Sequence, residues 1–149
     1  MRLVFTRGRG RLDRLDIFRG SRLLESVACA QDRILPEGMV HYALAMTLRQ
    51  RGLAVPLPYL PAAAEDDAPD RDSMERLLEV LTSGDGVLED FHPQQLLAAY
   101  RSACESWMCA PLPIGTDDLE AIHLHMLTLA AQWRDIEPGD SLTLMLPLK

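Results

Sequence analysis

The chain has 149 residues, of which 48% are hydrophobic and 25% are charged, and its formal net charge at pH 7 is −7. These proportions are typical of one globular domain over residues 1–149 and exclude an intrinsically disordered chain. The acidic balance disfavours nonspecific binding of nucleic acid, because phosphate-binding surfaces are usually basic. The sequence shows neither a signal peptide nor the apolar run of about 20 residues that crosses a bilayer, so we expect a cytoplasmic protein without membrane contact.

The first thirty residues predict an antiparallel β-meander. Three β-prone segments are separated by glycines: 3–6, 11–18 and 22–29. In the second segment Asp13, Leu15 and Ile17 alternate with outward-facing residues and share one face of a strand.

A mostly buried helix is predicted over residues 36–51. Gly52 stands where a left-handed helix cap belongs. Apolar residues occupy most of the helix circumference, and only the strip of His41, Ala45 and Arg49 is left for solvent or for a site.

Residues 53–71 carry four prolines and then an acidic run. Proline removes backbone donors, so we expect an extended excursion over the surface of the same domain. The segment is too short to separate two full domains.

Three further helices and a last strand complete the prediction. The helices are expected over about 72–82, 93–108 and 117–135, and the first and third open with the capping pattern D-x-x-E. The strand over 141–146 is expected to pair with an N-terminal strand. The fold class is therefore α+β, with the β-meander and the C-terminal strand in one small sheet packed by about four helices.

His41 is the leading candidate for a catalytic or ligand-binding residue. Glu37 lies four residues earlier, which on a helix places its carboxylate on the same side as the imidazole. The pair suits a general base with its orienting acid, or part of a metal site that takes a further ligand from His92 or from residues 85–90. The alternative is that Glu37 serves the helix N-terminus and His41 lies at the helix surface.

The other histidines and the cysteines give weaker signals. His123 and His125 point about 200° apart on a helix, so they cannot share a metal ion there. Cys29, Cys104 and Cys109 show no zinc-like spacing, and we expect small, mostly buried side chains. No metal site and no cofactor is predicted.

The N-terminal third is rich in arginine. On a hairpin, Arg7, Arg9 and Arg11 are candidates for gripping phosphate or an acidic partner. A solvated turn is the alternative, since the aromatic residues typical of single-strand binding are sparse here.

The order of features resembles that of a family of small bacterial α+β proteins of unassigned function. Its members open with a strand meander, continue with a helix around VHYA and close with W…PG…L.L..P. The matching residues here are Val40 to Ala43, Trp133, Pro138, Gly139, Leu142, Leu144 and Pro147. Members carry an acid four residues after the histidine, where this chain has Ala45. The resemblance therefore implies His41, with Glu37, as site residues, and it implies no activity.

Three functions stay open on the sequence. The first is a non-catalytic intracellular interaction domain that self-associates as a homodimer or binds a protein partner through its apolar first helix, an edge strand or the Pro-rich tract. The second is a small metal-binding or hydrolytic protein with a site around His41 and Glu37. The third is anionic-ligand binding by Arg7, Arg9 and Arg11.

Overall fold

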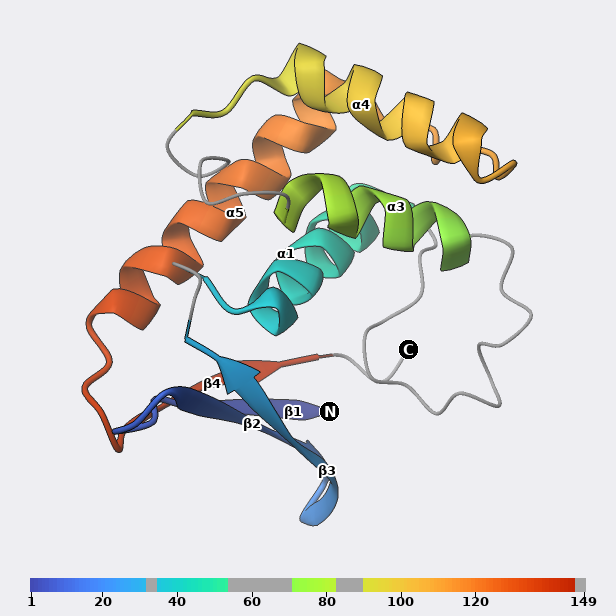
Figure 1. Cartoon of the computed structure of the whole chain (residues 1–149). Coiled ribbons are helices and arrows are strands. Elements are labelled where there is room, and N and C mark those ends of the chain that lie inside the picture. Colours follow the sequence, from blue (N-terminus) through green and yellow to red (C-terminus); the bar gives the residue numbers. More distant parts are fainter. Residues whose placement is uncertain (32–34, 54–70, 83–89, 147–149) are drawn as a thin grey trace. The chain divides into compact units, whose positions relative to one another are not determined.

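The computed structural model in Figure 1 describes residues 1–31, 35–53, 71–82 and 90–146. Within these ranges it contains four helices and one four-stranded antiparallel sheet, so the chain has the predicted α+β class. The chain divides into two units, Met1–Gly38 with Thr128–Lys149, and Met39–Leu127. The excursion predicted over residues 53–71 lies almost entirely outside the described residues.

The first unit contains a sheet in which β1 lies between two other strands (Figure 1). The strands are β1 (Arg2–Thr6), β2 (Leu12–Arg19), β3 (Arg22–Ala30) and β4 (Ser141–Met145). Their order is β3-β2-β1-β4, and every neighbouring pair is antiparallel. The predicted meander and the predicted return of the last strand to an N-terminal strand are both confirmed.

Alternation along the strands gives the sheet one buried face. Leu3 and Phe5 in β1 and Leu15 and Ile17 in β2 are almost completely buried. The ring of Trp133 packs edge-on against Phe5, with 6.5 Å between the ring centroids. Burial of these large side chains supplies the main favourable term for folding this unit.

A buried carboxylate holds the turn between β1 and β2. Asp13 shares the buried face, as predicted, and its Oδ1 accepts hydrogen bonds from the Gly8 backbone N–H at 2.8 Å and the Gln31 side-chain amide at 2.7 Å. A Cβ at position 8 would lie 1.7 Å from the Leu12 carbonyl oxygen. Only glycine fits there, because the backbone of β2 occupies the space of a side chain.

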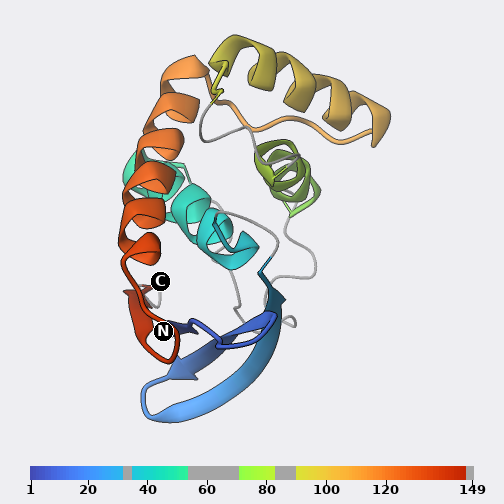
Figure 2. The same cartoon turned by 60° about the vertical axis from the view of Figure 1, so that its left-hand side comes forward.

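The four described helices match their predicted bounds to within two residues. They are α1 (Glu37–Gln50), α3 (Arg71–Thr82), α4 (Pro93–Ser106) and α5 (Thr116–Arg134), and Figure 2 shows them from a second direction. No helix in the described part of the chain has the length and hydropathy of a membrane-crossing segment.

Two details of the helix predictions are wrong. Ala45 was expected on the solvent-facing strip of α1, yet it is completely buried, because α1 is enclosed on that side as well. The capping pattern D-x-x-E predicted for α5 is Asp117 to Glu120, but the residue that reaches back to the cap is Asp118. Its Oδ2 accepts a hydrogen bond from the Gly115 N–H at 2.8 Å, which satisfies a backbone donor at the cap.

Helices α1 and α4 end in the same hydrogen-bonded motif with different residues at its critical position. After α1, the Leu53 N–H donates to the Leu48 carbonyl at 2.9 Å and Gly52 has φ +92°. After α4, the Cys109 N–H donates to the Cys104 carbonyl at 2.9 Å and Met108 has φ +56°. Both are Schellman caps, in which the left-handed residue is usually glycine. The predicted cap at Gly52 is confirmed, and Met108 is a strained counterpart.

This pair of caps predicts opposite effects of exchanging glycine and methionine. Met108→Gly should raise the free energy of unfolding by about 1 kcal/mol, because the left-handed conformation is costly for a residue with a Cβ. Met108 is 94% exposed, so the substitution removes little packing. Gly52→Met is the matched control and should lower the free energy of unfolding by a similar amount, since no contact within 4 Å is found for an added Cβ among the described residues and the backbone conformation is what changes in cost. Urea denaturation measures both, and an unchanged stability in both variants would contradict the strain at Met108.

Candidate functional site

His41 and Glu37 both lie on α1, in the positions that the sequence predicts. Glu37 is the first residue of the helix and its side chain is exposed, whereas the imidazole of His41, one turn later, is partly buried. Burial lowers the pKa of His41 from its ordinary value of 6.5 to about 4. The imidazole is therefore neutral at physiological pH.

This neutral imidazole narrows what chemistry His41 can perform. A general base works best when its pKa lies near the operating pH, and a pKa of about 4 makes His41 a weak base at pH 7. A neutral ring nitrogen remains a good metal ligand. In the part of the chain that the structure describes, no three His, Cys, Asp or Glu side chains gather as a metal site. A site around His41 and Glu37 stays a prediction.

The other histidines occupy separate environments. On α5, His123 stacks on Phe91 with 3.9 Å between ring centroids, while the His125 Nδ1 lies 3.2 Å from the Thr47 hydroxyl. His123 and His125 thus contact different residues. His92 stands at the N-cap of α4, where its Nε2 lies 2.8 Å from Asp90 Oδ1.

The three candidate arginines are divided between different contacts. The Arg7 guanidinium lies 4.8 Å from the centroid of Trp133, and its Nη1 donates to the Ile136 carbonyl at 2.9 Å. Arg9 is exposed and lies against Gly139, where its Nη2 would be 3.1 Å from an added Cβ. Arg11 is also exposed. Arg7 thus acts in the packing of its own unit, and an anion-binding proposal depends on Arg9 and Arg11.

Strand β3 presents a surface of a different kind. It lies at one edge of the sheet with β2 as its neighbour, and seven of its nine residues are exposed. Leu23 is 51% exposed and Leu24 is 40% exposed, which is unusual for leucines in a strand. Edge strands of natural proteins are commonly protected by lysine or proline, and the segment Arg22–Ala30 contains neither.

The backbone groups of β3 point alternately toward β2 and away from it. The Gln31 N–H donates to the Arg11 carbonyl, which fixes the phase of the antiparallel ladder. With Asp16 opposite Ser26 and Arg14 opposite Ala28, it follows that Ser26 and Ala28 direct their N–H and C=O groups away from β2. The open edge therefore carries backbone donors and acceptors beside exposed apolar side chains.

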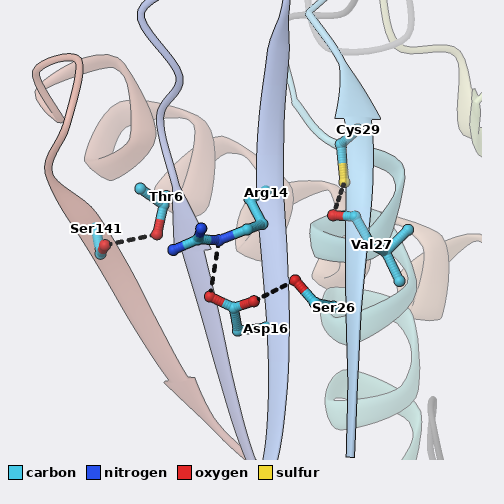
Figure 3. A network of polar contacts seen from close by, with 7 residues as sticks. All are labelled: Thr6, Arg14, Asp16, Ser26, Val27, Cys29 and Ser141. Atoms are coloured by element: carbon cyan, nitrogen blue, oxygen red, sulfur yellow. Dashed lines mark hydrogen bonds and ion pairs between the residues drawn. The ribbon is translucent and has the colours of Figure 1, made fainter. Parts of the chain in front are cut away.

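Polar contacts on the outer face of the sheet hold this edge in place (Figure 3). The Ser26 hydroxyl donates to Asp16 Oδ1 at 2.6 Å, and Asp16 Oδ2 accepts from Arg14 Nε at 3.0 Å. At the other side of the sheet, the hydroxyls of Thr6 and Ser141 lie 2.8 Å apart. The Asp16–Ser26 bond ties β3 to β2 within one chain, in addition to the backbone ladder.

Comparison with known proteins adds no assignment, since no family model, no curated protein and no solved structure matches this chain. The resemblance to small bacterial α+β proteins therefore stays a sequence-based expectation.

The buried state of His41 predicts a loss of stability in mild acid. The folded-state pKa of about 4 lies below the ordinary 6.5, so the stabilisation is complete above pH 6.5 and is lost as the pH falls toward 4. The neutral, buried His41 therefore contributes about 3 kcal/mol to the free energy of unfolding above pH 6.5. The pKa of His125 is lowered as well, chiefly by burial, and it acts in the same direction.

Urea denaturation at pH 7 and pH 4.5 measures this loss. His41→Gln should show a smaller fall in unfolding free energy between the two pH values than the unsubstituted protein. His92→Gln, which replaces an exposed histidine at the N-cap of another helix, is the control for the substitution itself. An identical fall for His41→Gln would contradict burial of a neutral His41.

Proposed function

We propose that this protein is a non-catalytic interaction domain that self-associates through the open edge of β3. The observation that carries the proposal is an exposed edge strand with outward backbone groups at Ser26 and Ala28 and exposed leucines at 23 and 24. An antiparallel second copy of β3 would satisfy these backbone groups and cover the leucines.

The charges of β3 favour a second copy as the partner. Among its nine residues only Arg22 and Glu25 are charged, and their charges cancel. With Ser26 paired to Ser26 of the second copy, Arg22 would lie opposite Ala30 and Glu25 opposite Val27. This register places no like charges opposite each other, which would be destabilising.

The expected dimer is weak. Stable interfaces bury more than about 1,000 Å² of surface in total. A single pair of short strands buries too little surface to exceed this area by a wide margin. We therefore expect dissociation constants in the micromolar to millimolar range rather than an obligate dimer.

Proline substitutions at the two edges of the sheet test this proposal. Ala28→Pro removes an N–H that points away from β2, so it should abolish self-association while the β2–β3 ladder persists. Thr143→Pro is the matched control. Thr143 lies on β4, the strand at the opposite edge of the sheet. Because the Leu146 N–H bonds to the Met1 carbonyl and the bonding residues alternate along β4, Thr143 directs its N–H away from β1. Thr143→Pro should leave self-association unchanged.

Sedimentation velocity over a concentration series, up to about 1 mM, measures the association constant of each protein. Circular dichroism checks that both variants are folded. The proposal is contradicted if the unsubstituted protein stays monomeric throughout, or if Thr143→Pro and not Ala28→Pro abolishes dimer formation.

A further inference from the structure

The Schellman cap after α4 brings two cysteines together. On a continuous helix, residues five apart point about 140° away from each other. In this cap the left-handed Met108 turns the chain back, and the Cys109 N–H bonds to the Cys104 carbonyl at 2.9 Å. The motif characteristically places these two side chains in contact. In the equivalent cap of α1 the same positions are held by Leu48 and Leu53.

The two thiols differ in accessibility. Cys104 is completely buried, whereas Cys109 is partly exposed, and both are free. Burial, together with the hydrogen bond between the Cys104 and Cys109 thiols, raises the pKa of Cys104, while a hydrogen bond with the Tyr100 side chain acts against the rise. Cys109 is therefore the thiol that a dissolved reagent reaches first.

A buried arginine lies beside this pair. The guanidinium of Arg76, on α3, stacks 3.8 Å from the centroid of Trp107, and the residue is only 5% exposed. Its Nη2 pairs with Glu75 at 3.5 Å and Glu79 at 3.3 Å. Its Nε and Nη1 are buried and find no acceptor among the residues that the structure describes. Unsatisfied buried donors are costly, and a nearby anion would relieve that cost.

The charge of Arg76 acts on Cys104 in particular. It lowers the pKa of the Cys104 thiol against the larger effect of burial. A Cys104 thiolate would thus gain a cationic partner, two of whose nitrogens have no acceptor among the described residues.

We propose that Cys104 and Cys109 form a reversible disulfide when the protein meets hydrogen peroxide. The Cys109 thiolate attacks one peroxide oxygen, the O–O bond breaks, and Cys109 becomes a sulfenic acid while the departing hydroxide takes up the thiol proton to form water. The Cys104 thiol then gives up its proton beside the Arg76 cation, whose charge favours the thiolate, and the Cys104 sulfur attacks the Cys109 sulfur. The S–O bond breaks, and the second hydroxide leaves as water with the Cys104 proton. Overall, two thiols and one peroxide give one disulfide and two waters.

Intact-mass spectrometry of the full chain tests the disulfide. After treatment of the reduced protein with one equivalent of hydrogen peroxide, the mass should fall by two hydrogen atoms, and a single thiol should still react with iodoacetamide. Peptide mapping should find Cys104 joined to Cys109, and dithiothreitol should restore the starting mass. Cys29→Ser is the control and should give the same linkage, because burial and the nearby Asp13 carboxylate raise the pKa of Cys29.

Cys109→Ser should abolish this mass loss, and it changes a partly exposed residue whose replacement the fold should tolerate. Mass gain by oxygen alone with no Cys104–Cys109 peptide would overturn the proposal, as would linkage only between two chains. The outcome does not depend on self-association through β3.

The role of Arg76 has a separate readout. In Arg76→Met the disulfide should form more slowly, by about tenfold for each unit by which the pKa of Cys104 rises. Cys109 sulfenic acid should then accumulate and react with dimedone. Arg76→Lys should restore part of the rate, because it keeps the charge. Equal rates in all three folded proteins would overturn the part assigned to Arg76.

Discussion

The central position of β1 is the constraint on which the sheet depends. Residues 1, 3, 5 and 7 of the N-terminal segment bond to β4, which leaves residues 2, 4 and 6 to bond to β2. The same alternation passes through β2 to β3, where it determines which peptide groups have no partner strand among the described residues. Which residues of β1 bond to β4 thereby determines which backbone N–H and C=O groups of β3 point outward at the opposite edge of the sheet.

Strand β3, at the edge of the sheet, is hydrogen-bonded to β2 and carries exposed apolar side chains. The Asp16–Ser26 hydrogen bond crosses the middle of the β2–β3 ladder, and the Arg14–Asp16 ion pair lies beside it on β2. Leu23 and Leu24 lie near the hairpin end of the ladder. A register shift between Ile17 and Phe18 marks a bulge close to those leucines. Bulges are one way in which proteins protect sheet edges, and here the regular segment from Glu25 to Ala30 remains unprotected by any such device.

Much of the fold was predictable from local sequence signals. Alternation identified Asp13, Leu15 and Ile17 as one face, and Gly52 marked the end of α1, because both signals act within a few residues. Tertiary surroundings were not predictable in this way. Ala45 is enclosed and the α4 cap uses methionine, so neither position carried a sequence signal that fits its environment.

The candidate sites show the same limit. The helical spacing placed His41 and Glu37 on α1 correctly, but the lowered pKa of His41 follows from burial that the helix pattern alone does not give. Arg7, Arg9 and Arg11 are close in sequence, yet Trp133 and the Ile136 carbonyl engage the first of them from the other end of the chain. The Cys104–Cys109 pair was hidden because its five-residue spacing brings thiols together only across a left-handed turn.

Amide hydrogen exchange of β3, followed by NMR at low and high protein concentration, tests the central claim most directly. Pairing of the open edge predicts that the Val27 and Cys29 amides are protected at every concentration, since they bond to β2, whereas the Ser26 and Ala28 amides become protected only as the concentration rises. Ser26 and Ala28 amides that exchange equally fast at both concentrations, in samples where dimer is present, would contradict it.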